Sequence, residues 1–307
     1  MSRARSNRRK SAIPFIVFWI IMLAASLYLL GTFLRPFSFP LQVQILTSTD
    51  WAGYSVATDF NSPKQLVTGV SGSWIVPEVT VSQTDTFSAA WIGIGGQLDK
   101  SLIQTGTEHD SINGTAEYSA WYELLPDFSI GINMNILPGD KITASIQLLN
   151  SATNEWTIDI ADTTNGQRFQ QNVQYNSPRL SAEWIVERPT IGQDLGTLAN
   201  FGSVTFTAAS AIIQGNTGSI TDFSYVQIIM QDRQNRPLVT VSSLNTDGSS
   251  FRVNYLSIVS SAQNQLSESL SSNMATPLEN DLIISSHPNS RKLTSCTHRY
   301  NQERPKL

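Results

Sequence analysis

The feature of the sequence that most constrains its fold is a series of short segments in which apolar and polar residues alternate. A period of two places successive side chains on opposite faces of a β-strand. Turn-forming pairs such as Asn165-Gly166 and Asp247-Gly248 separate several segments, and residues 50–258 keep no sustained helical period. We therefore predict an all-β, antiparallel sandwich or barrel. The alternating segments are residues 67–77, 87–94, 102–106, 115–125, 141–149, 155–160, 181–189, 203–207, 225–230, 239–242 and 251–255.

A long uncharged segment precedes the alternating region. Residues 11–34 carry no charged side chain and follow five positive charges in residues 1–10. A helix of that length spans roughly 36 Å, more than a hydrocarbon core of about 30 Å. Because basic residues stay in the cytoplasm, we predict a signal-anchor that makes a single-pass protein of the cell membrane, with the remainder outside. The alternative is a cleaved signal peptide and a secreted protein, although signal sequences usually have shorter apolar runs.

Composition divides the rest of the chain into three parts. Residues 35–48 contain Pro36 and Pro40 and are predicted to be a linker. Residues 49–258 hold the β domain. Residues 259–307 are polar and rich in Ser and Asn, and we predict a disordered tail there. We expect the chain to be a monomer.

The charge balance and the cysteine count restrict the possible partners. Residues 41–258 hold nine Lys and Arg against twenty Asp and Glu, a net charge of −11. This balance argues against nucleic acid as a partner, because phosphate binding needs clustered basic side chains. Cys296 is the only cysteine, so no intrachain disulfide forms, and with three histidines we expect no metal site. Nothing in the sequence indicates a cofactor.

The segment Ser181–Pro189 carries two acids on an otherwise apolar strand. In a two-residue alternation, Glu183 and Glu187 share a face with Ile185. That face is either half exposed, with its carboxyls in water, or part of a cleft that holds a carboxyl for proton transfer. Taken singly, each acid is expected to lie in water, and the same holds for Glu108, Glu117 and Glu123. Nearby aromatic residues fit either a core or a surface that binds peptide or sugar; they are Trp51, Trp91, Trp121, Tyr122 and Trp184.

His109 is the only histidine of the β domain. It lies in a polar sequence, residues 108–114, and we expect an exposed loop side chain. A serine triad needs a well-supported histidine, and the domain also lacks a Gly-x-Ser-x-Gly turn. A serine hydrolase is therefore not favoured.

Six motifs in one order resemble the glutamic peptidase (eqolisin) family. They are Trp51-Ala-Gly-Tyr54, Ala90-Trp-Ile-Gly-Ile94, Ile103-Gln-Thr-Gly106, Ala120-Trp-Tyr-Glu-Leu-Leu-Pro-Asp127, Ala182-Glu-Trp-Ile-Val-Glu-Arg-Pro189 and Asn200-Phe-Gly-Ser-Val-Thr-Phe206. The resemblance covers about residues 50–256. It implies a sandwich of two long, curved antiparallel sheets with a cleft on the concave side. It also implies endopeptidase activity on polypeptides at acidic pH through a glutamine–glutamate dyad.

Carried over by motif, the resemblance places the catalytic pair on Gln104 and Glu183, with Glu187 as a second candidate for the carboxyl. The positions that line or support the cleft match Trp51, Gly53, Trp91, Trp121 and Glu123. Some positions depart from the family pattern: Asp50 replaces an asparagine, Gly95 an acid, Glu108 an aspartate and Leu125 a tyrosine. These departures bear on subsite preference more than on the chemistry, because both residues of the dyad are present.

The residue types of the dyad suit amide hydrolysis in acid. We expect Glu183 to act first as base and then as acid, while Gln104, which does not ionise, orients the water and donates to the oxyanion. Two alternatives stay open. One is a non-catalytic, membrane-anchored sandwich that binds peptide or glycan through its aromatic face. The other is a glycosidase with Glu123 and Glu183 as a carboxyl pair about 5–9.5 Å apart.

Overall fold

The computed structural model describes residues 44–257 and 299–300. The described part is almost entirely β-structure, which confirms the predicted fold class. Its elements are β1 (Gln44–Ser48), β2 (Trp51–Ala57), β3 (Val67–Ile75), β4 (Ala89–Gly95), β5 (Leu102–Ile112), β6 (Thr115–Leu124), β7 (Ile130–Ile132), β8 (Lys141–Asn150), β9 (Glu155–Asp162), β10 (Arg168–Gln174), β11 (Ser181–Glu187), β12 (Thr190–Ile191), β13 (Asp194–Leu195), β14 (Ser203–Ile213), β15 (Asn216–Ser219), the 3-10 helix η1 (Ile220–Asp222), β16 (Ser224–Met230), β17 (Val239–Val241), β18 (Phe251–Tyr255) and β19 (Arg299–Tyr300).

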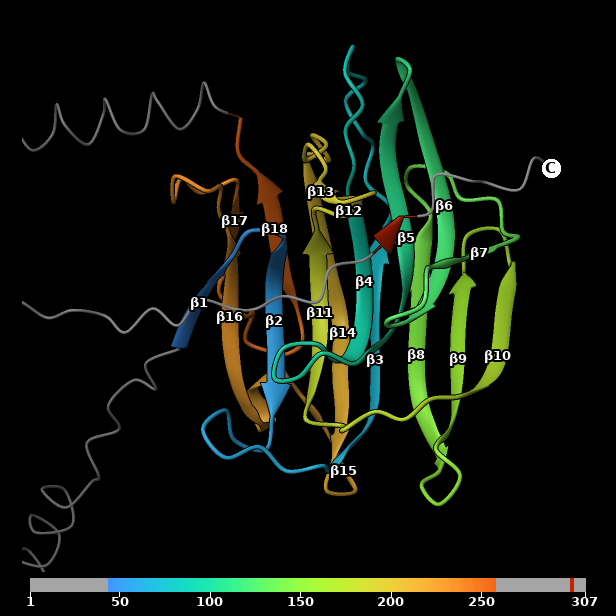
Figure 1. Ribbon diagram of the computed structural model, residues 1–307, viewed down its shortest axis with the longest axis vertical. Coiled ribbons are helices and arrows are strands. Elements are labelled where there is room, and N and C mark those ends of the chain that lie inside the picture. The colour runs from blue at the N-terminus through green and yellow to red at the C-terminus, as the bar shows by residue number, and fades with distance from the viewer. Residues whose placement is uncertain (1–43, 258–298, 301–307) are drawn as a thin grey trace, which may run out of the picture. The chain divides into compact units, whose positions relative to one another are not determined.

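The strands form two large sheets. The first has the order β1-β16-β2-β11-β4-β5-β6-β7, and the second has the order β10-β9-β8-β3-β14-β18-β17, with β15 also paired to β14. A small sheet joins β13, β12 and β19. Figure 1 shows the strands of both large sheets running nearly along one direction, as in an aligned sandwich. The pairing is antiparallel except for β1 with β16 and β12 with β19.

A large hydrophobic core fills the space between the two sheets, and polar side-chain tips bridge them. The indole nitrogen of Trp184 in the first sheet donates to the carbonyl oxygen of Ser71 in the second, at 2.8 Å. In the other direction, Trp74 Nε1 donates to Thr107 Oγ1 at 2.9 Å. Both indoles are buried. The buried donors are therefore satisfied across the interface, which fixes how the sheets are placed on each other.

Strand β11 lies near the middle of the first sheet, between β2 and β4. Trp184 and Val186 belong to the core between the sheets, whereas Ile185 belongs to a second apolar cluster on the opposite face. The predicted alternation of this strand is therefore confirmed. The face that carries Glu183 and Glu187 is the outer face of the first sheet, away from the second sheet.

Two segments outside the predicted domain form strands. Residues 44–48, predicted to be linker, form β1 beside β16, because Leu46 buries its side chain in the second apolar cluster. Within the predicted disordered tail, Arg299–Tyr300 pair with β12 as β19. The predicted cytoplasmic segment 1–10, the membrane helix 11–34 and most of the linker and tail lie outside the described residues. Among the residues that the structure describes, no helix is long and apolar enough to cross a membrane.

The prediction for His109 is wrong. It lies within β5, which continues to Ile112, and its ring is buried rather than exposed. Nε2 lies 2.8 Å from Thr107 Oγ1, the same hydroxyl that accepts from Trp74. The polar sequence is misleading here because both faces of this strand are covered. The turn that we expected comes only at Asn113-Gly114, where both residues have positive φ.

Candidate active site

A row of polar side chains crosses the outer face of the first sheet. Cα pairing runs from Ser55 on β2 to Glu183 on β11, to Gly93 on β4, to Gln104 on β5 and to Glu123 on β6. Directly paired residues of adjacent strands project from the same face of a sheet. The fold thus brings Gln104 and Glu183, some eighty residues apart in the chain, to the two sides of a single glycine.

Gly93 lies in this row between the two residues of the predicted dyad. Two interstrand spacings of about 4.8 Å separate the backbones of Glu183 and Gln104, and the glycine adds no side chain on this face between them. A Cβ at Gly93 would lie 2.8 Å from Leu102 Cδ1 and 2.9 Å from Trp91 Cζ3. The side chains of Leu102 and Trp91 therefore cover Gly93, and the position has no room for a side chain of its own.

Gln104 is held by its neighbour in the row. Its Nε2 donates to Glu123 Oε2 at 2.6 Å, and the side chain is completely buried. Only the nitrogen end of an amide donates to a carboxylate, so this bond sets the orientation of the amide. A second hydrogen on Nε2 stays available for another acceptor, such as a substrate carbonyl.

Glu183 is a buried carboxyl with a raised pKa. Burial raises the pKa well above its usual range, the neighbouring hydroxyls of Ser181 and Ser55 lower it, and the negative charge of Asp99 raises it further. The contact with Ser55 joins Oγ to Glu183 Oε1 at 3.1 Å. Because burial is the largest effect, Glu183 carries a proton over a wider range of pH than an exposed glutamate does.

Glu187, the second candidate for the carboxyl, lies in a different row. It pairs with Trp51 on one side and Ala89 on the other, and Ala89 in turn pairs with Glu108. Its Oε2 accepts a hydrogen bond from Trp91 Nε1 at 2.6 Å. Glu187 therefore holds an indole in place and does not lie in the row of Gln104.

An aromatic wall flanks the polar row. Trp51 and Trp91 meet edge to face, with ring centroids 5.0 Å apart, and belong with Trp121 to the second apolar cluster. Glycines make this packing possible. Gly53, with φ of 149°, lies so close to the Trp184 carbonyl that a Cβ would be 2.0 Å from the oxygen. The five predicted cleft positions are thus all on or beside this face.

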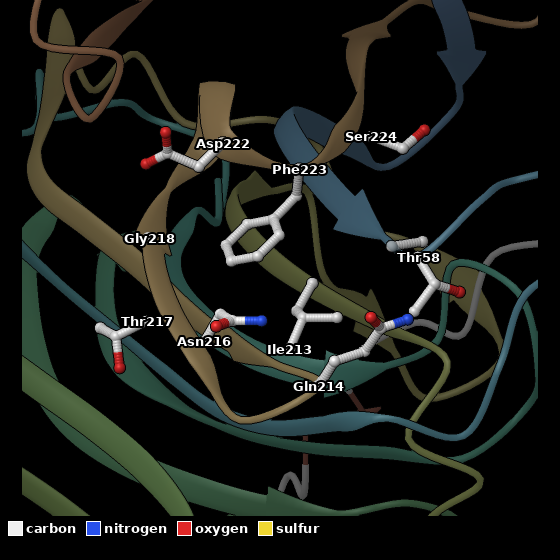
Figure 2. Close-up of a pocket in the computed structure, with 10 residues that line it drawn as sticks. Thr58, Ile213, Gln214, Asn216, Thr217, Gly218, Asp222, Phe223 and Ser224 are labelled. Atoms are coloured by element: carbon white, nitrogen blue, oxygen red, sulfur yellow. The ribbon is translucent and has the colours of Figure 1, made fainter.

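Another concavity lies at an end of β2, between the β14–β15 hairpin and the segment after η1 (Figure 2). Its single carboxyl, Asp222, accepts hydrogen bonds from the Ser219 backbone and hydroxyl, which lower its pKa. A carboxyl with a lowered pKa is a poor proton donor in acid. The lining includes no residue of the row around Gln104 and Glu183.

Comparison with known proteins identifies the family of this fold and site. The model of the peptidase A4 family matches residues 49–255, about two thirds of the chain. The chain belongs to this family, the glutamic peptidases. It is therefore a hydrolase of peptide bonds, and the fold class and the predicted resemblance are confirmed.

Relatives of this glutamic peptidase agree in sequence and in fold. Aspergillopepsin-2 from Aspergillus niger is 30% identical over 234 residues, which cover 68% of this chain and 78% of that protein. Scytalido-glutamic peptidase, solved with a transition state analog inhibitor, is 22% identical with a TM-score of 0.57 over 68% of this chain and 98% of its own. Aspergilloglutamic peptidase from Aspergillus niger is 29% identical with a TM-score of 0.50, over 56% and 99% of the two chains.

The glutamic peptidase site differs in two ways from what the sequence indicated. Four of the five acids expected in water are buried, namely Glu108, Glu123, Glu183 and Glu187. Sequence reasoning also missed Ser55, Gly93 and Asp99. The two-residue alternation could have identified the first two. Ser55 lies on the same strand face as Trp51 and Gly53, and Gly93 lies on the same face as Trp91. Asp99 lies in a connection without periodicity, so no sequence signal pointed to it.

Proposed function

We propose that this chain is an acid-acting endopeptidase in which Glu183 is the proton-transferring carboxyl and Gln104 the amide partner. One observation carries the proposal. A buried carboxyl with a raised pKa and a buried neutral amide lie in one row across the sheet, on the two strands that flank Gly93. A scissile peptide bond bound between them would meet a proton donor on one side and a hydrogen-bond donor on the other.

The raised pKa of Glu183 favours an order of steps opposite to the one that we expected from the sequence. Glu183 starts protonated and gives its proton to the carbonyl oxygen while water attacks the carbonyl carbon; the carboxylate then takes a proton from that water. The result is an uncharged tetrahedral diol and a reprotonated Glu183. Next, Glu183 protonates the amide nitrogen, the C–N bond breaks, and the carboxylate recovers a proton from a diol hydroxyl. An amine and a carboxylic acid leave.

Gln104 acts on the oxygen that accepts the first proton. Its free Nε2 hydrogen donates to the carbonyl oxygen and then to the diol, while the other hydrogen stays on Glu123 Oε2. One such donor is typically worth about 10²–10³ in kcat. Because an amide does not titrate, this contribution is independent of pH. Trp51, Trp91 and Trp121 supply the apolar surface along which an extended polypeptide would bind.

Incubating the full chain with an unfolded protein at pH 3.5 and at pH 7 tests the proposal. We expect proteolysis at pH 3.5 that is insensitive to chelators and to serine-directed inhibitors, and little at pH 7. Binding without turnover would instead support the non-catalytic alternative. Release of sugars from a glycan, with no peptide cleavage, would support the glycosidase alternative, in which Glu123 and Glu183 would act together.

A further inference from the structure

The connection between β4 and β5, residues 96–101, folds onto the aromatic wall of the site. A Cβ at Gly96 would lie 2.7 Å from Trp51 Cη2, so the backbone of the connection touches the indole directly. Gly95 and Gly96 both have φ near +90°, which an L side chain rarely adopts. The charge of Asp99, in the same connection, acts on Glu183. These contacts place the connection at the edge of the site.

Gln97 lies in this connection and holds a buried acceptor without a donor. The side chain is only 8% exposed, and its Oε1 is buried and accepts no hydrogen bond among the described residues. Gln104 of the proposed dyad has an Oε1 in the same state, whereas Gln227, outside the site, donates to Tyr54 and to two carbonyl oxygens. An unsatisfied buried polar atom weakens the folded state, so its presence beside a substrate cleft indicates that a ligand supplies the missing donor.

A buried donor without an acceptor belongs to Trp51, the indole that this connection contacts. Trp51 Nε1 is buried and donates to nothing in the described part of the chain, although the same indole contacts Gly96. One free acceptor and one free donor at the same edge match the two hydrogen-bonding groups of a peptide unit, its N–H and its C=O. The chemistry of the pair therefore fits polypeptide backbone. It does not select a particular side chain.

We propose that Gln97 is a substrate-binding residue of this peptidase, whose Oε1 accepts a hydrogen bond from a backbone N–H of an extended polypeptide beside Trp51. The proposal deepens the proposed function and depends on it for the identity of the substrate. An amide suits this role because it stays neutral at the acidic pH where carboxylates change charge. It also adds a polar contact to an otherwise apolar wall.

The Gln97→Met variant tests the proposal, because methionine keeps the length of the side chain and removes the amide. We expect KM for oxidised insulin B chain at pH 4 to rise about tenfold, with kcat within about twofold of the wild type. Tm of the free enzyme should stay the same or rise, since an unsatisfied buried acceptor is lost. The control Gln170→Met changes an exposed residue of β10 and should alter neither. An unchanged KM, or a fall in Tm together with a fall in kcat, overturns the proposal.

A binding measurement separates this proposal from the proposed function. The dissociation constant for oxidised insulin B chain is measured by calorimetry in the Glu183→Gln variant, with and without Gln97→Met. A tenfold weaker affinity supports the role of Gln97, even if the wild type cleaves no peptide and the proposed function fails. If the wild type cleaves peptide but neither KM nor affinity responds to Gln97→Met, this inference alone is overturned. If no variant binds or cleaves the peptide, both are overturned.

Discussion

The pKa of the Glu183 carboxyl is set by surroundings that act on it in opposite directions. Burial and the charge of Asp99 raise the pKa, while hydroxyl donors lower it. A carboxyl in this setting keeps its proton in mild acid and still releases it when charge develops on a nearby oxygen. The balance explains why the site holds serines and an acid around one glutamate: they adjust the range of pH in which Glu183 is protonated.

Two substitutions should move the pH profile in opposite directions. Ser55→Ala removes a donor that lowers the pKa of Glu183, so the fall of kcat/KM at the alkaline side should move to higher pH. Asp99→Asn removes a charge that raises this pKa, so the alkaline fall of kcat/KM should move to lower pH. The control Glu78→Gln neutralises an exposed acid and should leave the profile in place. Shifts of the same sign for both variants would contradict the assignment of Glu183.

His109 should make the fold less stable in acid. Burial lowers its pKa to about 3, from 6.5 in the unfolded chain. Above pH 6.5 both states are neutral, so His109 has no effect. As pH falls below 6.5 only the unfolded state gains the proton, and stability decreases until pH reaches about 3. Between pH 7 and pH 4 this amounts to about 3 kcal/mol.

Denaturant unfolding of His109→Gln at pH 7 and pH 4 measures this cost. Glutamine is able to keep a hydrogen bond to Thr107 and does not titrate. We expect the loss of unfolding free energy between the two pH values to be about 3 kcal/mol smaller than in the wild type. An equal loss in both proteins would show that His109 takes up a proton in the folded state.

Strand β4 contributes Gly93, which has no side chain, to the row of the proposed site. Its neighbours across the sheet, on β11 and β5, carry the two long side chains of the proposed dyad. On either side along β4, Trp91 and Gly95 belong to the wall and to the tight connection that follows. The strand thus separates the two residues of the proposed dyad by two strand spacings and adds no side chain of its own between them.

Gly93→Ala should damage the site more than it damages the fold. The new methyl group would press on Leu102 and Trp91, at 2.8 and 2.9 Å. We expect a loss of about 1–3 kcal/mol of stability and a fall in kcat of about 100-fold from displaced reacting groups. Gly131→Ala, on β7, is the matched control, because a Cβ there meets nothing within 4 Å. Comparable kcat values for the two variants would show that the packing around Gly93 does not position the reacting groups.

The sequence allowed a better prediction of the strand face on which a residue lies than of which strands pair in a sheet. The period of two correctly assigned Glu183 and Ile185 to one face and Trp184 to the other, because alternation follows from the backbone alone. Pairing between distant strands has no such local signal. That β11 lies between β2 and β4, and that Gly93 separates Gln104 from Glu183, depends on contacts across more than eighty residues. Only the resemblance to the glutamic peptidases indicated that the two residues belong to one site.

The burial of polar side chains was the property predicted least well from the sequence. His109 was expected in water because its local sequence is polar, and four glutamates that prove buried were expected there because a single acid is usually solvated. The first sheet has apolar clusters on both faces, however, so polar residues of its central strands are buried on either side. The strand β1 was missed for a related reason: its pairing with β16 depends on the edge of a distant strand and not on its own pattern.

The charge of the domain suits work in acid. Residues 41–258 carry a net charge of −11 at pH 7, which moves toward zero as carboxylates take up protons. Self-repulsion therefore decreases over the range in which the proposed dyad acts. The ion pairs Arg168–Asp159 and Arg236–Asp232 involve exposed arginines, so their loss in acid costs little. The loss of stability in acid that comes from His109 is thus opposed by the decrease in self-repulsion of the domain.

Hydrolysis of an unfolded polypeptide at pH 3–5 by Gln104→Ala, Glu183→Gln and Glu187→Gln tests the dyad most directly. We predict that the first two variants lose activity by at least about 10²–10³-fold. Glu187→Gln should keep measurable activity, since glutamine still accepts a hydrogen bond from Trp91. At pH 7, Glu183→Gln should also be at least as stable as the wild type, because the raised pKa of the buried carboxyl lowers stability as pH rises above 4.5. An active, folded Glu183→Gln variant beside an inactive Glu187→Gln variant would contradict the assignment.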